Sequence, residues 1–477
     1  MIAPDNSEKV TSPARRIGIF GHVGTKNLGD ETIIAAVIQN TRRRFPEAEI
    51  RAFTFQPEDT RLRHGIAAFP IRQVVQSRVD PEAPTKGEHR TDSSDGPGAR
   101  IQASLKKIPL LYSCLKGIRD GFGFLRGIWR EVGFLAQSYR NLKGTELLMI
   151  AGSGQLTDQS GGSWAYPYTF FKWSFLARAT GTKLAFMSIG TGWIDSPLSK
   201  FFFRSALSRA DYLSFRGEDF RKQVGEWGLR GESIVVPDLA YSFHMPNIAA
   251  QPKSSHSSPV VGINPVPFFH ETMWHKADKQ IYDQYVQTQS SFASWLIRRG
   301  YTVLFFPTQL RADPPVIQDI VQALERNHPG LSGYQTVDPP MRSHEDLISV
   351  MSGMDIVVAA RFHGVLISHL LHKPVLAVSY HAKTADLMAQ MGQSQCVLHI
   401  DACSLDALTS RFLFLESQSK AIAAELERRV PSCRAALDSQ YERVFGLLEQ
   451  GVVRAQTPNK SKAWPKEPSN ARIDYGS

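Results

Sequence analysis

Short apolar runs alternate with stretches whose apolar residues recur at helical spacing, and this alternation continues through both halves of the chain. A parallel strand that is covered on both faces is apolar at nearly every position, so the runs predict buried strands. They lie at residues 17–20, 49–55, 146–151 and 183–188 in the first half, and at 260–264, 302–306, 356–359 and 375–379 in the second. The pattern predicts an α/β protein with two doubly wound, Rossmann-like domains that face each other across a cleft.

The same pattern sets the domain boundaries. We expect the first domain at residues 16–245 and the second at residues 259–450. Residues 246–258, PNIAAQPKSSHSS, have the composition of a linker. The polar ends at residues 1–15 and 451–477 are expected to be disordered.

An insertion at residues 75–143 interrupts the first domain. Its first part has almost no apolar residues and predicts a disordered surface loop. In residues 100–143, basic residues alternate with apolar and aromatic ones, and only Asp120 and Glu131 are acidic. This part predicts one or two basic amphipathic helices, broken by Pro109 and by glycines. Such a segment either attaches to an anionic membrane surface or packs on the domain with a solvated basic face.

Composition places the 477-residue chain among soluble globular proteins, with 42% hydrophobic and 21% charged residues. The net charge of +10 and the pI near 9.4 suit an enzyme that attracts anions, but equally an anionic membrane or nucleic acid. The four cysteines form no CxxC pair and have no histidine at metal-ligand spacing, so we expect neither a disulfide framework nor a metal site. Residues 1–16 lack an apolar core and no run is long enough to span a membrane, which favours a cytoplasmic protein.

Two charged clusters follow neighbouring strands of the second half. Arg361-Phe362-His363-Gly364 comes after the strand at 356–359, and Tyr380-His381-Ala382-Lys383 comes after the strand at 375–379. Parallel strands end at the same edge of a sheet, so both clusters should open on one crevice. A cation at a helix amino terminus is unfavourable unless an anion binds there, which predicts a phosphate or carboxylate site. Alternatively, Arg361 pairs with a neighbouring carboxylate and His363 is a buried structural histidine.

The loop after the first strand, GHVGTKNLGDE, is rich in glycine but lacks the GxGxxG spacing of a dinucleotide site. Asp30 and Glu31 at the mouth of the next helix would repel a pyrophosphate, so a neutral, hydroxyl-rich ligand suits this loop better. Asp30 could also be only the N-cap of that helix.

Three further positions could meet a ligand in the first half. Gly152 opens a turn where backbone can approach a ligand closely. Trp193 either stacks on a sugar or is a core tryptophan. Arg216 ends a short strand and could bind an anion or pair with Glu218 or Asp219.

The stretches Ala360-Arg361-Phe362-His363-Gly364 and Ser379-Tyr380-His381-Ala382-Lys383 resemble the carboxyl-terminal signature of the polysaccharide pyruvyl transferases. Asn27-Leu28-Gly29-Asp30-Glu31 is similar to the amino-terminal motif of that family. The resemblance implies transfer of pyruvate from phosphoenolpyruvate onto a sugar of a polysaccharide, or of its lipid-linked precursor, as a ketal. It also implies a fold similar to the two-domain GT-B glycosyltransferases, with no cofactor and no nucleic-acid partner.

The resemblance assigns the first domain to the acceptor and the second to the donor. The residues expected to bind phosphoenolpyruvate are Arg216, Arg361, Phe362 and Lys383, and those expected to bind the acceptor are Asn27, Gly29, Glu31, Gly152 and Trp193.

The chemistry of ketal formation suggests two catalytic side chains. His363 could protonate the enol methylene, because an imidazole titrates near the pH of the cytoplasm. Asp30 is the weaker candidate, for orienting or deprotonating the acceptor hydroxyl. No metal is needed, since carbon rather than phosphorus is attacked.

Two other functions fit parts of the sequence. A GT-B glycosyltransferase would bind the pyrophosphate of a nucleotide sugar at the same anion site. A non-catalytic protein could bind anionic lipid or polysaccharide through residues 100–143, which could also hold an enzyme peripherally at the inner face of the membrane.

Overall fold

The computed structural model describes residues 14–453, except for residues 22, 23, 25, 74–108, 153, 160, 191, 246–257, 275 and 339. It describes no side chains for residues 109–125 and 450–453. The expected insertion loop, nearly all of the linker and most of both tails lie outside the described residues.

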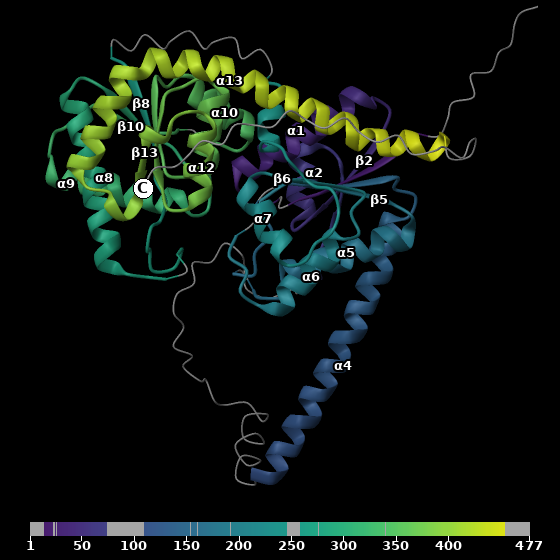
Figure 1. The fold of residues 1–477 in the computed structure, drawn as a ribbon. Helices are drawn as coiled ribbons and strands as arrows, with labels where there is room; N and C mark the ends of the chain where they lie inside the picture. The colour runs from purple at the N-terminus through teal and green to yellow at the C-terminus, as the bar shows by residue number, and fades with distance from the viewer. Residues whose placement is uncertain are drawn as a thin grey trace, which may run out of the picture.

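The first domain is built on a seven-stranded parallel sheet with the strand order β3-β2-β1-β4-β5-β6-β7 (Figure 1). Its strands are β1 (Arg16–Phe20), β2 (Glu49–Thr54), β3 (Ala67–Pro70), β4 (Leu147–Ala151), β5 (Lys183–Ile189), β6 (Tyr212–Phe215) and β7 (Ile234–Val235). The helices are α1 (Leu28–Arg44), α2 (Pro57–His64), α4 (Pro109–Leu142), α5 (Tyr166–Thr180), α6 (Pro197–Leu207) and α7 (Glu218–Glu226), and η1 (Leu239–Ser242) is a 3₁₀ turn.

Both faces of this sheet are buried. In β4, Leu147 and Met149 belong to the hydrophobic core that includes α1, whereas Leu148 and Ile150 belong to the core that includes α5 and α6. A strand with two buried faces has no polar positions to alternate with, which is why the sequence shows it as an uninterrupted apolar run.

The second domain has a six-stranded parallel sheet with the order β10-β9-β8-β11-β12-β13. Its strands are β8 (Val260–Asn264), β9 (Thr302–Phe305), β10 (Tyr334–Thr336), β11 (Ile356–Ala359), β12 (Val375–Ser379) and β13 (Val397–His399). Its helices are α8 (Lys279–Arg298), α9 (Asp313–Asn327), α10 (His344–Ser352), α11 (Phe362–Leu370) and α12 (Ala382–Gln390), with 3₁₀ turns η2 (Ser394–Cys396) and η3 (Ile400–Ala402). Two doubly wound domains, as the sequence predicted, are therefore present.

The strand order reverses between β1 and β4 in one sheet and between β8 and β11 in the other. Ligands of such folds bind at the carboxyl ends of the strands beside this reversal. Here the loops at the two reversals meet, because Asn27 forms an antiparallel bridge with Gln309, and the amide of Leu28 donates to the carbonyl of Thr308 at 2.9 Å. The two candidate ligand edges thus face each other.

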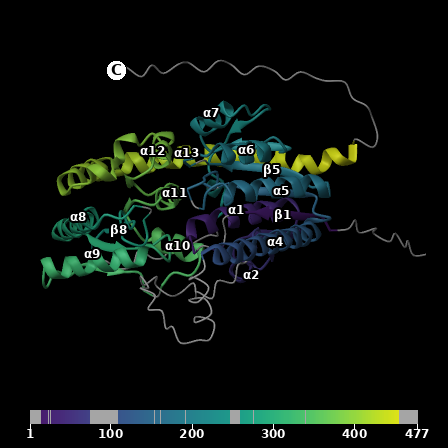
Figure 2. The ribbon, with the colours of Figure 1, turned by 90° about the horizontal axis from the view of Figure 1, so that it is seen from below.

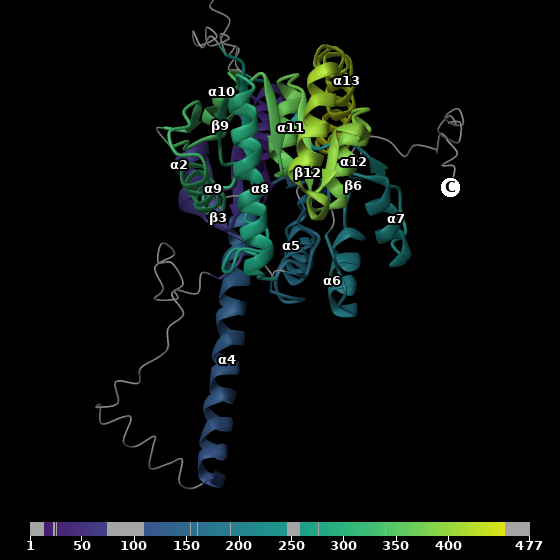
Figure 3. The ribbon, with the colours of Figure 1, turned by 90° about the vertical axis from the view of Figure 1, so that its left-hand side faces the viewer.

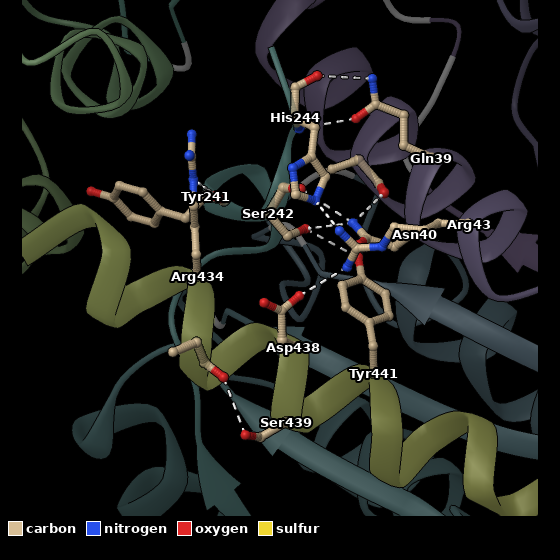
Figure 4. A network of polar contacts seen from close by, with 12 residues as sticks. Gln39, Asn40, Arg43, Tyr241, Ser242, His244, Arg434, Asp438, Ser439 and Tyr441 are labelled. Atoms are coloured by element: carbon tan, nitrogen blue, oxygen red, sulfur yellow. Dashed lines mark hydrogen bonds and ion pairs between the residues drawn. The ribbon is translucent and has the colours of Figure 1, made fainter. Parts of the chain in front are cut away.

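The last helix, α13 (Leu405–Val453), begins in the second domain and runs back along the first (Figure 2). Its Gln440 is buried between β5 and β6, where it accepts from Ser214 Oγ at 2.5 Å and donates to Ser188 Oγ at 3.1 Å. Asp438 pairs with Arg43 of α1 at 3.0 Å (Figure 4). The segment expected to belong to the second domain therefore also holds the two domains together.

Helix α4 leaves the body of the protein as one continuous rod (Figure 3). The sequence predicted that glycines break this segment, and that prediction is wrong, because the helix is continuous through them. The predicted break at Pro109 agrees with the start of the helix, and the residues before Pro109 lie outside the described ones. Pro109 is the first residue of the helix, where its missing N–H costs nothing. A glycine inside a helix costs about 1 kcal/mol relative to alanine but does not end it. Among the described residues, no helix is long and apolar enough to cross a membrane.

Candidate active site

A cavity of about 240 Å³ lies where the two strand-order reversals meet. Residues of the first domain that line it include Asn27, Asp30, Gly154, Gln155, Tyr166 and Arg216. Residues of the second domain that line it include Arg361, Phe362, His363, Tyr380 and Lys383. The structure therefore brings together both charged clusters of the second half, Arg216, and part of the NLGDE loop.

The loop that leads into α1 places two of its residues in the cavity. Asn27 is the N-cap of α1, and its Oδ1 accepts from the amide of Gly29 at 3.2 Å. Its amide Nδ2 donates to Asp30 Oδ2 at 2.8 Å. Asp30 therefore lies in the first turn of the helix and is not the N-cap, which was one of the two sequence interpretations.

Burial changes the protonation of Asp30. Only 8% of Asp30 is exposed. Loss of hydration, with neighbouring Glu31 adding to it and Lys383 opposing it, raises the pKa of Asp30 to about 7. A carboxyl group with this pKa can hold or release a proton near neutral pH.

Arg216 is held by Asp238, which lies between β7 and η1. Arg216 Nη1 donates to Asp238 Oδ2 at 2.8 Å, and the guanidinium of Arg216 lies 4.5 Å from the centre of the Phe362 ring. Arg216 Nη2 is buried without a hydrogen-bond partner among the described residues. The expected alternative pairing is wrong, because Glu218 pairs with Arg221 instead. Arg216 thus lines the cavity with one donor that has no partner among the described residues.

Arg361 is already paired with a carboxylate, as one of the two sequence interpretations expected. Its Nε and Nη2 donate to Asp313 Oδ1 at 2.9 and 2.5 Å. Burial acts to lower its pKa, but Asp313 and Tyr380 outweigh burial and raise it. Asp313 Oδ2 in turn accepts from the amides of Thr308 and Gln309 at 2.9 and 2.8 Å. Arg361 is thus fixed in position with its charge largely balanced.

Lys383 has no such counterion. Its ammonium forms no ion pair or hydrogen bond with the described residues and lies 5.9 Å from the centre of the Phe362 ring. Burial lowers the pKa of Lys383, Tyr380 opposes the shift and Arg216 adds to it. Of these three cations, Lys383 is the one whose charge is least satisfied, and a bound anion would satisfy it.

His363 is the second residue of α11 and is 8% exposed. Burial lowers the pKa of His363 to about 4, with Asp238 opposing and Arg216 and Lys383 adding to the shift. Its Nε2 is buried without a partner among the described residues. The imidazole is therefore neutral at pH 7, and nearby negative charge would favour its protonated form.

Of the five residues predicted to bind the acceptor, only Asn27 lines the cavity. Three of the others, Gly29, Glu31 and Gly152, lie behind its wall. Gly29 packs against the ring of His363, where an added Cβ would lie 2.1 Å from His363 Cγ. Glu31 is fully buried, accepting from the amide of Gly24 at 3.0 Å and pairing with His64 at 2.8 Å. Gly152 lets β4 pass close to β5, since a Cβ there would lie 2.2 Å from the carbonyl of Ser188. These three positions support the site from behind.

Trp193 is 64% exposed, so the interpretation of it as a core tryptophan is wrong. It follows β5 in the chain, and its carbonyl accepts from Thr157 Oγ1 at 3.2 Å. Thr157 does line the cavity, which places Trp193 close to its rim.

Sequence reasoning missed several cavity residues. Tyr166 stands in an aromatic segment whose sequence is typical of a core, but it also lines the cavity. Gln155 lies in the turn that Gly152 opens, and its buried Oε1 has no partner among the described residues. Asp313 follows β9, which ends at the sheet edge that carries the cavity. A carboxylate after a strand that neighbours β8 is the sequence signal that could have identified it.

Within the described residues no group of histidine, cysteine or carboxylate side chains could hold a metal ion.

Comparison with solved structures finds proteins of the same two-domain, GT-B-like fold. UDP-GlcNAc 2-epimerase from Neisseria meningitidis, bound to UDP-GlcNAc, has a TM-score of 0.53 and 12% identity over 91% of this chain and 100% of its own. The MnaA–UDP structure from S. aureus has a TM-score of 0.52 and 9% identity over 94% of this chain and 100% of its own. At such identities the likeness concerns the fold alone.

Sequence comparison identifies the family. No curated protein matches the sequence. The family model of the polysaccharide pyruvyl transferases matches residues 27–382, which is more than half of the chain and runs from Asn27 to the start of α12. The chain therefore belongs to the polysaccharide pyruvyl transferase family.

Proposed function

We propose that this protein transfers pyruvate from phosphoenolpyruvate to a sugar of a polysaccharide, or of its lipid-linked precursor, as a ketal, and releases phosphate. The observation that carries the proposal is the cluster of Lys383, the free edge of Arg216 and the fixed Arg361 around one small cavity. Phosphoenolpyruvate presents a phosphate and a carboxylate, and such anions are bound well by arginine and lysine side chains.

The size of the cavity favours this donor over a nucleotide sugar. Sites for drug-sized ligands measure about 300–1,000 Å³. The cavity here is about 240 Å³, which suits a donor as small as phosphoenolpyruvate together with one reacting part of a sugar. The amino terminus of α11 lies at the cavity, since Arg361, Phe362 and His363 line it, and the partial positive charge of a helix amino terminus favours an anion.

The donor would lie on the second domain. Lys383 and the free Nη2 of Arg216 would contact its negative groups, and Arg361 would complete the positive side of the site. The charged groups of Arg216 and Lys383 both lie over the ring of Phe362, which limits the positions that they can take.

The acceptor would lie on the first domain, where, apart from Arg216, uncharged hydrogen-bonding side chains and Asp30 line the cavity. A sugar hydroxyl could donate to Asp30 or to the unpartnered Oε1 of Gln155. Tyr166 would contribute an aromatic wall and a hydroxyl group. This side of the cavity suits a neutral ligand with several hydroxyl groups.

In the reaction, the first acceptor hydroxyl bonds to the central carbon of phosphoenolpyruvate as the methylene carbon gains a proton. The bond between that carbon and the phosphate oxygen then breaks as the second hydroxyl closes the ketal, and the proton of this hydroxyl leaves with the phosphate. His363 would supply the first proton. Burial is the main reason for its lowered pKa, and a bound donor would neutralise the positive charge of Arg216 and Lys383 that adds to this shift. Asp30 would take the proton of the acceptor hydroxyl, which its pKa of about 7 permits.

The reaction would take place in the cytoplasm, where the sequence analysis expects the protein. Neither assignment of a proton-transfer role depends on a metal ion or on an organic cofactor.

Thermal unfolding with and without ligands tests the donor. Phosphoenolpyruvate at a hundred times its dissociation constant should stabilise the protein by about 2.7 kcal/mol, which raises the unfolding midpoint by a few degrees. The shift should be lost in Lys383→Ala and kept in Lys222→Ala, an exposed lysine of α7. A shift with UDP-sugars and none with phosphoenolpyruvate would contradict the proposal in favour of glycosyl transfer. Incubation with candidate acceptors, read by the methyl signal of the ketal, would then identify the sugar.

A further inference from the structure

Helix α4 projects from the first domain, and only its carboxyl-terminal part is anchored (Figures 1 and 3). The anchor is Glu131, which pairs with Lys172 of α5 at 3.0 Å and accepts from Gln73 at 2.6 Å. Ser138 and Leu142 are buried, and Leu135 packs on the core of the first domain. The helix beyond this anchor extends away from the sheet.

A second face of the anchored part is apolar and exposed. Trp129 is 73% exposed, Val132 49% and Tyr139 36%. At 3.6 residues per turn these positions share one stripe, which is turned by about 100° around the helix from the stripe of Glu131, Leu135, Ser138 and Leu142. The apolar stripe is therefore not the surface that packs on the protein. The same spacing continues toward the amino terminus in the sequence, at Leu115, Ile118, Phe122 and Leu125.

Unbalanced positive charge lies beside the apolar stripe. Arg126 and Arg130 are exposed and form no ion pair with the described residues. Glu131, the only acid among the residues of α4 whose side chains are described, is neutralised by Lys172. An exposed apolar stripe next to cations, with an aromatic residue in the stripe, is the pattern of a helix that lies in the interface of an anionic bilayer.

A second copy of α4 fits this stripe less well. The apolar spacing of alternately three and four residues resembles a heptad repeat, in which charged residues at the flanking positions select the partner. In α4 one flank carries Arg119, Arg126 and Arg140, and the other carries Cys114, Gly121, Ile128 and Leu135. Two copies would bring arginines together in an antiparallel pair and would form no ion pairs in a parallel one.

We propose that α4 is a peripheral membrane anchor, with Trp129 and Val132 inserted among the lipids and Arg126 and Arg130 in contact with anionic headgroups. The partner is the surface of a bilayer, and the chemistry that selects it is the phosphate charge of its lipids. The proposal does not depend on the donor or on the reaction assigned to the cavity.

Cosedimentation with vesicles tests the anchor. The full chain should bind vesicles of equal parts phosphatidylcholine and phosphatidylglycerol, and bind vesicles of phosphatidylcholine alone much more weakly. High salt should weaken the binding, because exposed charges are screened. Replacing both arginines, Arg126→Gln with Arg130→Gln, should lower the partition coefficient by about tenfold to thirtyfold, given the usual contribution of a basic residue at an anionic surface.

The apolar part is tested with a matched pair of tryptophans. Trp129→Ser should lower the partition coefficient about tenfold, whereas Trp164→Ser, a tryptophan 69% exposed on the body, should leave it unchanged. Unchanged thermal unfolding midpoints would show that the variants are folded. Equal binding to both kinds of vesicle, or equal loss in both tryptophan variants, would overturn the proposal. A dimer in sedimentation velocity that Trp129→Ser dissociates would assign the stripe to a second copy instead.

Discussion

Gly29 of α1 and His363 of α11 come from different domains and touch at the wall of the cavity. A Cβ added to Gly29 would lie 2.1 Å from His363 Cγ and 2.2 Å from His363 Nδ1, far inside van der Waals contact. The glycine therefore sets how closely the two domains can approach and where the imidazole stands.

Gly29→Ala should displace the His363 ring or push the domains apart. A misplacement of about 1 Å in a catalytic group can cost on the order of a hundredfold in rate, so we expect a loss of that size in kcat. The control is Gly225→Ala in α7, where an added Cβ meets nothing within 4 Å. That variant should gain about 0.5–1 kcal/mol of stability and keep its activity. Unimpaired turnover in Gly29→Ala would show that the contact does not position His363.

The pair Arg216–Asp238 predicts a link between stability and donor binding. Asp238→Asn leaves the buried Arg216 without its counterion, and removing one partner of a buried pair typically costs about 3–5 kcal/mol. The free energy of unfolding should fall accordingly. Because a bound anion would supply the missing charge, phosphoenolpyruvate should raise the unfolding midpoint of this variant by more than that of the wild type.

A variant of an exposed pair provides the comparison. Glu218→Gln removes the counterion of Arg221, which lies on the surface of α7. It should change stability by less than about 1 kcal/mol and leave the effect of phosphoenolpyruvate untouched. If Asp238→Asn behaved like Glu218→Gln, the charge of Arg216 would not be part of an anion site.

The sequence could predict the arrangement of strands because these strands are short, apolar and buried on both faces. Their carboxyl ends then placed Arg361 and Lys383 at one edge without any knowledge of contacts. The same reasoning could not show that Arg361 is paired with Asp313, since that contact joins loops 48 residues apart. Side-chain pairing across a cavity depends on the tertiary fold, which local patterns do not contain.

The acceptor side was harder to predict for a similar reason. Gly29, Glu31 and Gly152 looked like ligand residues because they stand in glycine-rich or acidic loops. In the structure, Gly29 and Gly152 allow two elements to pack closely, and Glu31 pairs with His64. Only the packing of β4, β5 and α11 reveals these roles. Gln155 and Tyr166 reach the cavity from segments whose sequence is typical of a turn and of a core.

Donor binding should take up a proton through His363. Burial lowers the pKa of His363 to about 4, and the charges of Arg216 and Lys383 add to this shift. A bound anion offsets these two charges and raises the pKa, so the affinity gained from protonation is fully present at low pH and is lost as pH rises through the pKa of the complex. Titration calorimetry at pH 7 in buffers of different ionisation enthalpy measures the proton uptake. It should be smaller in His363→Gln, and equal uptake in both proteins would exclude His363 as the group that is protonated.

Asp30→Asn should make the protein more stable at pH 8 while it abolishes most of the activity. Burial raises the pKa of Asp30 from 3.8 to about 7, so the folded protein keeps this carboxyl protonated where the unfolded chain ionises it. The stability that the protonated group provides is fully present below pH 3.8 and is lost as pH rises through about 7. At pH 8 the wild type therefore bears a cost of up to about 4 kcal/mol that an asparagine avoids.

Denaturant unfolding of the wild type and Asp30→Asn at pH 4 and pH 8 measures this difference. The two proteins should have similar free energies of unfolding near pH 4, and the variant should be the more stable one at pH 8. Asp195→Asn, at an exposed position, should show no such divergence. Gain of stability with loss of turnover would mean that Asp30 is kept in an unfavourable environment because the reaction uses its carboxylate to accept a proton. A variant that is less stable at pH 8, or equally active, would make Asp30 a structural residue of α1.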